Sequence, residues 1–127
     1  MLQRIALVLL FASLALVACG TSDTPGVRTE TAAQAVSHMS DRTVIDVRTP
    51  AETAQGMIAG AIQINVEAPD FQARIDQLDR DGGYLLYCRS GNRSAQAASI
   101  MRDLGFTDVI DAGGYEALVA AGAPTAP

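Results

Sequence analysis

The chain has 127 residues, of which nine are basic and fourteen acidic, so its formal net charge is −5. This length limits the chain to one domain, and the acidic balance argues against nucleic acid as a partner, because such binding rests on clustered cations. All nine cations are arginine. The lack of lysine excludes Schiff-base chemistry and leaves permanent cations that can hold an anion through two hydrogen bonds.

The first predicted element is a segment that is removed rather than folded. Arg4 precedes an apolar run of fourteen residues from Ile5 to Ala18, which is typical of an export signal. A helix of this length spans roughly 21 Å, which is short of the roughly 30 Å hydrocarbon core of a bilayer. Because Leu16 to Cys19 resembles a bacterial lipobox, residues 1–18 are predicted to be a signal peptide of the lipoprotein type.

Cys19 is the predicted lipidation site and mature amino terminus. Residues 19–27 then form a flexible tether, because Gly20 to Gly26 are small, polar and rich in residues that interrupt helices and strands. Two alternatives stay open, namely an ordinary signal peptide that leaves Cys19 as a plain thiol and an uncleaved anchor. The lipid predicts a location in the cell envelope, on the extracytoplasmic side of a membrane, either periplasmic or at the cell surface.

The second cysteine, Cys88, needs a different explanation. If Cys19 carries lipid, Cys88 is the only thiol left and has no partner for an internal disulfide. Cys88 and the single histidine, His38, are too few for a metal site of three or four ligands, so no metal is predicted. A lone exported thiol of this kind indicates a reactive role.

The body of the chain alternates helical and strand patterns. Apolar residues at helical spacing predict helices, and short β-branched runs predict buried strands. The helices are expected over 29–39, 51–55, 71–78, 95–104 and 115–121, and the strands over 43–47, 62–66, 84–87 and 108–111. This alternation predicts an α/β fold with a mostly parallel central sheet and helices on both faces. Ligands of such sheets bind at the carboxyl ends of the strands, where Cys88 lies.

The segment from Cys88 to Ser94 joins a strand to a helix. Small residues in such a turn aim backbone N–H groups at one point, and the helix terminus adds a partial positive charge. An anionic sulfur is stabilised there, so the Cys88 thiol is expected to have a lowered pKa. The alternative is a buried cysteine beside an ordinary helix cap. The residues expected to form the loop around Cys88 are Arg89, Ser90, Gly91, Asn92, Arg93 and Ser94.

Three segments resemble signatures of the rhodanese family. They are Val44 to Glu52, Gly60 to Ile64 and Cys88 to Ser94, followed by Gly105-Phe106 and Gly113-Gly114. The resemblance implies a rhodanese-like three-layer fold over residues 28–124 and a monomer. The alanine- and proline-rich composition at the end of the chain predicts a disordered tail at 125–127. The six residues from Cys88 to Arg93 match the family's sulfur-transferring loop, whereas related phosphatases and arsenate reductases have a seven-residue loop.

The resemblance also implies the activity. Cys88 is similar to the family's nucleophile, which takes a sulfane sulfur from a small anionic donor such as thiosulfate and holds it as a persulfide. The sulfur then passes to a thiol or to an acceptor like cyanide, without a cofactor. Two alternatives stay open. One is a carrier or redox-sensing module that uses Cys88 for a protein partner without turnover, and the other is a purely structural lipoprotein.

The charged residues around the loop have two interpretations each. Asp46 and Arg48 match a family signature, and the preferred role of Asp46 is structural, through an ion pair with Arg48 or with Arg93. Arg48 could instead face the pocket and attract the anionic donor. Arg93 either contacts the substrate or clamps the loop through a carboxylate such as Glu52. Arg89 is the preferred donor-binding cation, because its position in the loop predicts greater exposure.

Overall fold

A computed structural model describes residues 26–127. The predicted signal peptide at 1–18, the lipidation site Cys19 and the tether up to residue 25 lie outside the described residues. Within 26–127, no helix has both the length and the apolar composition needed to cross a membrane.

The central sheet has five strands in the order β1-β6-β5-β2-β4, and every neighbouring pair is parallel. The strands are β1 (Gly26–Thr29), β6 (Asp108–Gly114), β5 (Gly83–Cys88), β2 (Thr43–Asp46) and β4 (Ile62–Gln63). The inner strands are rich in valine, isoleucine and leucine without alternation, because both of their faces are covered.

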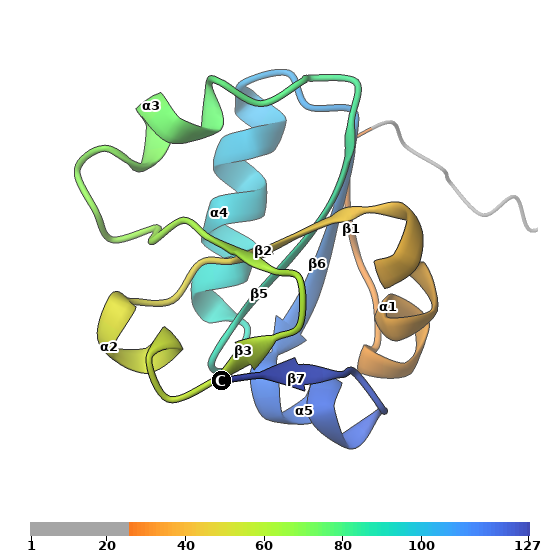
Figure 1. Ribbon diagram of the computed structural model, residues 1–127. Helices are drawn as coiled ribbons and strands as arrows, with labels where there is room; N and C mark the ends of the chain where they lie inside the picture. The colour runs from red at the N-terminus through yellow and green to blue at the C-terminus, as the bar shows by residue number, and fades with distance from the viewer. Residues whose placement is uncertain (1–25) are drawn as a thin grey trace, which may run out of the picture.

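Helices cover both faces of this sheet, as Figure 1 shows. On one side lie α1 (Ala32–His38), which continues into the short 3₁₀ helix Met39–Asp41, and α5 (Tyr115–Ala120). On the other side lie α3 (Phe71–Ile75) and α4 (Asn92–Asp103). The predicted three-layer fold with a mostly parallel sheet is confirmed.

Two apolar cores lie on opposite faces of the sheet, and successive side chains of β5 point alternately into one and the other. Leu86 and Cys88 point toward α3 and α4, whereas Leu85 and Tyr87 point toward α1 and α5. All four residues are fully buried. The sulfur of Cys88 therefore lies on the α4 side of the sheet, at the end where the chain leaves β5.

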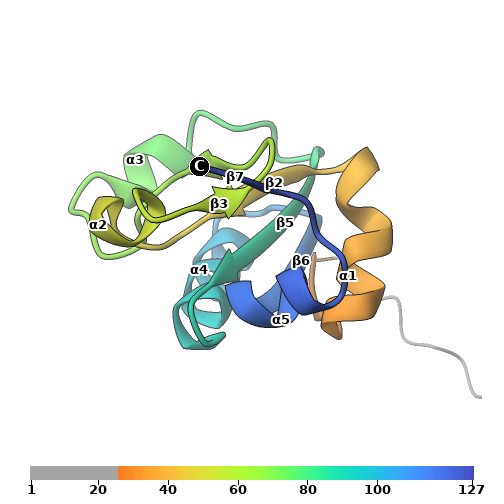
Figure 2. The same cartoon turned by 60° about the horizontal axis from the view of Figure 1, so that its bottom comes forward.

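The C-terminal residues are ordered, which corrects the prediction of a disordered tail at 125–127. Strand β7 (Thr125–Ala126) pairs antiparallel with β3 (Met57–Ile58), and the two strands lie side by side in Figure 2. Gly122 turns the chain with a φ of +102°, and Ala123 is buried in the core beside α1. These contacts outweigh the alanine and proline composition that predicted fraying.

The folded part also begins earlier than predicted. Gly26 and Val27, assigned to the tether, are the first residues of β1, which pairs with β6 at the edge of the sheet. The side chain of Val27 packs against the core beneath α4. A four-residue edge strand with one apolar side chain carries too weak a pattern to be detected from sequence.

Candidate active site

The loop around Cys88 is the predicted turn from strand to helix. Strand β5 ends at Cys88, and helix α4 begins at Asn92. Gly91 caps the helix with a φ of +102°, a left-handed conformation that a residue with a Cβ adopts only under strain. The exposed residues are Arg89, Ser90 and Asn92, Arg93 is half-buried, and Ser94 is fully buried.

A second glycine lets the loop lie against β6. A Cβ added to Gly114 would approach the carbonyl oxygen of Arg89 to 2.7 Å, which is closer than real Cβ contacts allow. Gly114 is also the residue paired with Cys88 across the sheet, after a shift in register between Leu86 and Cys88. Strand β6 thus contacts the back of the loop at Gly114. Sequence analysis identified this glycine only as part of the family resemblance, without a reason for it.

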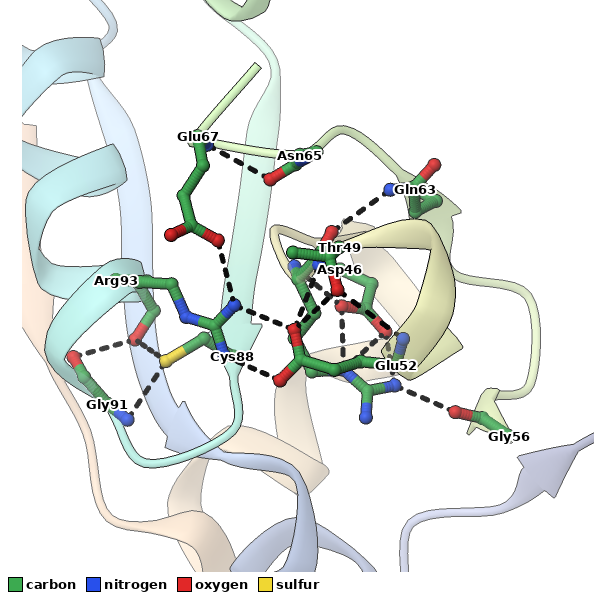
Figure 3. A network of polar contacts seen from close by, with 12 residues as sticks. Asp46, Thr49, Glu52, Gly56, Gln63, Asn65, Glu67, Cys88, Gly91 and Arg93 are labelled. Carbon is green, nitrogen blue, oxygen red and sulfur yellow. Dashed lines mark hydrogen bonds and ion pairs between the residues drawn. The ribbon is translucent and has the colours of Figure 1, made fainter. Parts of the chain in front are cut away.

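The Cys88 sulfur is surrounded by hydrogen-bonding groups. The Gly91 N–H donates to Sγ at 2.9 Å (Figure 3). Sγ also lies 3.6 Å from the Ser94 hydroxyl. Burial raises the pKa of the Cys88 thiol, whereas hydrogen bonds from the Ser94 side chain and from the backbone of Ser94, Gly91 and Ser90 lower it. The outcome is a pKa below the ordinary value of the thiol, in agreement with the sequence-based expectation.

Arg93 holds the loop to α2 (Pro50–Thr53). Its guanidinium forms two bonds of 2.7 Å with the two oxygens of Glu52, and a longer contact of 3.3 Å with Glu67 (Figure 3). This pairing, with further bonds from Thr49, lowers the pKa of Glu52 to about 2, and the Glu52 bond raises the pKa of Arg93. Of the two roles predicted for Arg93, the clamp through Glu52 is confirmed.

Asp46 and Arg48 form a buried ion pair. Their closest atoms, Arg48 Nη2 and Asp46 Oδ2, are 2.7 Å apart, and both side chains are almost fully buried. The Tyr87 hydroxyl donates to Asp46 at 2.6 Å, and Arg48 also donates to the Gly56 carbonyl. The preferred structural interpretation of Asp46 is confirmed, and its partner is Arg48 rather than Arg93. Tyr87 was missed, since an aromatic residue in an apolar strand gives no sign of a role for its hydroxyl.

A cleft of about 440 Å³ adjoins the loop. Its lining combines charged, polar and aromatic residues from the loop, from the segment between β2 and α2, from α2 and its following turn, and from α5. They are Arg48, Glu52, Gln55, Gly56, Arg89, Tyr115 and Glu116. Arg89 reaches the cleft and is exposed, as predicted for a cation that meets an anionic donor. Arg48 also borders the cleft. It therefore pairs with Asp46 and lies near the pocket at the same time.

Asp111 is a buried carboxylate at the site that sequence analysis did not single out. One of its oxygens accepts hydrogen bonds from the Ser94 hydroxyl at 2.7 Å and from the Gly113 N–H at 3.2 Å. One signal was available in the sequence. Asp111 follows Val109 by two positions in a predicted buried strand, so both side chains lie on one face and the carboxylate is expected to be buried. Among residues 26–127, no three acidic, histidine or cysteine side chains are grouped to hold a metal ion.

Comparison with known proteins places this geometry in a family. Residues 31–121 match the Rhodanese-like domain. A sulfurtransferase of Allochromatium vinosum is 34% identical over 85 residues, which cover 67% of this chain and 78% of that protein. The thiosulfate sulfurtransferase PspE of Escherichia coli is 34% identical over 72 residues, covering 57% of this chain and 69% of that protein.

Solved structures agree with the sequence comparison. The crystal structure of a rhodanese-related protein from Thermoplasma volcanium superposes with a TM-score of 0.68 and 32% identity, covering 78% of this chain and 97% of that one. The chain therefore belongs to the rhodanese-like domain family. Its sulfurtransferase relatives support sulfur transfer as the general activity and a transferase of the rhodanese type.

Proposed function

We propose that the protein is an extracytoplasmic, lipid-anchored sulfurtransferase in which Cys88 carries sulfur as a persulfide. The donor is a small sulfane-sulfur anion such as thiosulfate, and the acceptor is a thiol or a nucleophile like cyanide. The observation that carries the proposal is the set of hydrogen bonds around Sγ of Cys88, with the Gly91 N–H at 2.9 Å.

The chemistry takes place in two balanced steps. The Cys88 thiolate attacks the outer sulfur of thiosulfate, a Cys88 S–S bond forms, and the S–S bond of the donor breaks as sulfite leaves with the electron pair. The acceptor then attacks the outer persulfide sulfur, and Cys88 returns as a thiolate. Neither step needs an oxidant or an acid for the leaving group, and the lowered pKa of Cys88 supplies the thiolate that starts the cycle.

The surroundings of the loop favour an anionic donor. Arg89 is exposed at the cleft, and its side chain forms no hydrogen bond or ion pair with any of residues 26–127. Glu52 and Arg93 largely neutralise each other through their two short bonds. Arg89 is thus the cation best placed to attract thiosulfate, in line with its preferred role.

Steady-state turnover tests this function. The full-length protein and its Cys88→Ser variant are incubated with thiosulfate and cyanide, and sulfite and thiocyanate are measured. The proposal predicts equal amounts of both products in many turnovers for the wild type and none for the variant. One equivalent of sulfite without turnover would favour the persulfide carrier, and product formation by the variant would contradict a role for Cys88.

The membrane anchor is tested separately. The lipobox-like segment before Cys19 and the apolar run before it support lipidation. Expression in a bacterium with labelled palmitate is expected to label the wild type but not Cys19→Ala, and globomycin is expected to block processing of the wild type. Processing that is insensitive to globomycin and gives an unlabelled protein would favour an ordinary signal peptide.

A further inference from the structure

Behind the loop, a chain of hydrogen bonds runs from the sulfur to a buried carboxylate. The Cys88 thiol donates to Ser94 Oγ at 3.6 Å, and the Ser94 hydroxyl lies 2.7 Å from Asp111 Oδ1. Ser94 has no exposed surface, and Asp111 is only 6% exposed. The sulfurtransferase steps described above do not use Asp111.

The geometry makes Asp111 and the sulfur compete for one hydrogen atom. A serine hydroxyl carries a single hydrogen. Once Cys88 is ionised, three acceptors surround Ser94 Oγ: Asp111 at 2.7 Å, the Gly91 carbonyl at 3.0 Å and the Cys88 sulfur at 3.6 Å. The carboxylate oxygen of Asp111 is the closer of the two ionised acceptors, at 2.7 Å against 3.6 Å for the sulfur, and a short hydrogen bond to an ionised oxygen is a strong one. The more closely this hydrogen is held by Asp111, the less the Ser94 hydroxyl stabilises the thiolate.

We propose that Asp111 is a positioning residue for Cys88, whose carboxylate draws the Ser94 hydroxyl hydrogen toward itself and thereby weakens one hydrogen bond to the thiolate. The inference deepens the proposed function, on which it rests, because it concerns the reactivity of the same thiol. No covalent step is added. When Cys88 ionises, its proton leaves to water while Ser94 stays bound to Asp111.

This arrangement has a chemical use. The backbone N–H groups of the loop lower the pKa of Cys88, but a thiolate loses nucleophilicity as its pKa falls, so an attacking thiol works best when its pKa is close to the ambient pH. Asp111 acts against the lowering of the Cys88 pKa by the loop, and so keeps the sulfur from becoming too weak a nucleophile. The carboxylate thus sets the balance between the fraction of thiolate and its reactivity.

Other charged groups surround this unit and stay in place in the test. They are Arg93 of α4, Arg89 of the loop, Glu67 after β4, Glu30 after β1 with its partner Arg28 of β1, Glu52 of α2 and Glu116 of α5. Substitution of Asp111 by asparagine leaves all of them unchanged and keeps an oxygen that can accept from Gly113.

The experiment measures the rate of Cys88 alkylation by neutral iodoacetamide against pH, in the full-length protein, with peptide mass spectrometry to separate Cys88 from Cys19. Asp111→Asn is expected to lower the apparent pKa of Cys88 by about one unit, which raises the thiolate fraction about tenfold at a pH below both pKa values. Because each thiolate is about threefold less reactive, alkylation at that pH is expected to be about threefold faster. The limiting rate at high pH is expected to fall about threefold, because nucleophilicity falls with pKa.

Ser94→Ala is the control that isolates the proposed route. With Ser94→Ala present, adding Asp111→Asn is expected to produce less than half of the shift, since the hydroxyl that connects the two groups is gone. An equal shift in both backgrounds would mean that the charge of Asp111 acts directly through space and would overturn the proposal. An unchanged or raised pKa in Asp111→Asn would overturn it as well.

Two further safeguards keep the outcome decisive. Alkylation reports on the thiol whether or not it accepts sulfur, so failure of the proposed sulfurtransferase function and failure of this inference are distinguishable. Asp111→Ser, which also removes the charge, repeats the measurement if Asp111→Asn does not fold. Loss of folding in both variants would give Asp111 a purely structural role and contradict the proposal.

Discussion

Cys88 and Arg89, two neighbouring residues at the start of the loop, have different roles in the proposed reaction. Cys88 is buried beneath the loop and takes its reactivity from the groups that surround the sulfur. Arg89 is its exposed neighbour and reaches the cleft. The nucleophile and the donor-binding cation are therefore adjacent in sequence but face different surroundings, and they can be tested independently.

Arg89→Gln is predicted to raise the KM for thiosulfate about fivefold with little change in kcat. The reason is that an exposed charge a few ångströms from an anion contributes about 1 kcal/mol in water. The effect is expected to shrink at high ionic strength because salt screens exposed charges. Steady-state kinetics check this, with Arg102→Gln at the far end of α4 as the charge-matched control. Equal effects of the two variants would refute a local role for Arg89.

Gly114→Ala is predicted to displace the loop. The added Cβ would meet the Arg89 carbonyl at 2.7 Å, so the backbone around the sulfur must move. We expect kcat/KM to fall at least tenfold, because small misplacements of reacting groups are costly. Gly105→Ala is the control, since its φ of +94° makes alanine strained in open space at the other end of α4. If both variants lose the same stability and Gly114→Ala stays active, the close contact between Gly114 and the Arg89 carbonyl does not matter for catalysis.

At the scale of elements, α2 and α4 are joined through one ion pair. Thr49 and Glu52 form a capping box that begins α2, and Glu52 also binds Arg93 in the first turn of α4. The same carboxylate thus begins one helix and positions the start of another. Since the loop around Cys88 lies directly before α4, this pair connects the stability of α2 to the geometry of the site.

Glu52→Gln is predicted to lower the free energy of unfolding at pH 7 by about 1 kcal/mol, because a partly exposed pair is screened by solvent. The folded pKa of Glu52 is depressed to about 2, so the stabilisation is complete above the unfolded pKa of about 4.3 and is lost as the pH falls toward 2. Thermal unfolding between pH 7 and pH 2 should show the two curves converging. Glu116→Gln, at an exposed position, should show no such convergence, and a constant difference for Glu52→Gln would exclude the pair as its cause.

At the scale of the whole molecule, the C-terminus contributes to the fold. Strand β7 pairs with β3, the Ala59 N–H donates to the Pro124 carbonyl at 2.8 Å, and β3 follows Gly56, which borders the cleft and accepts from Arg48. The last residues of the chain are therefore connected to the neighbourhood of the site through one short ribbon (Figure 2).

Removal of residues 125–127 is predicted to destabilise the protein by about 1 kcal/mol, as expected for the loss of one or two backbone hydrogen bonds. For a domain of this size the melting temperature should fall by about 4–8 °C. Differential scanning calorimetry of the full-length chain and of a chain ending at Pro124 checks this. An unchanged melting temperature would mean that these residues contribute nothing to stability, as the sequence-based prediction of a frayed tail had implied.

Most of the fold was predictable, because its inner strands and long helix carry strong patterns. The segment 84–87 is a continuous apolar run, and 95–104 has helical spacing with Gly105 after it. Strands β1 and β7 could not be predicted, because each gains its stability from pairing with a strand that is distant in the sequence. At the site, the small loop and its lone thiol identified Cys88, whereas Asp111 and Tyr87 act through contacts that no local pattern encodes.

The measurement that tests the central claim most directly is the mass of Cys88 after one exposure to thiosulfate. The reduced full-length protein is treated with thiosulfate, the excess is removed, and the peptide that contains Cys88 is analysed by mass spectrometry beside the same peptide from Cys88→Ser. We predict the addition of one sulfur atom to the wild-type peptide, reversed by cyanide, and none to the variant. An unmodified wild-type peptide, or sulfur on a residue other than Cys88, would contradict the account.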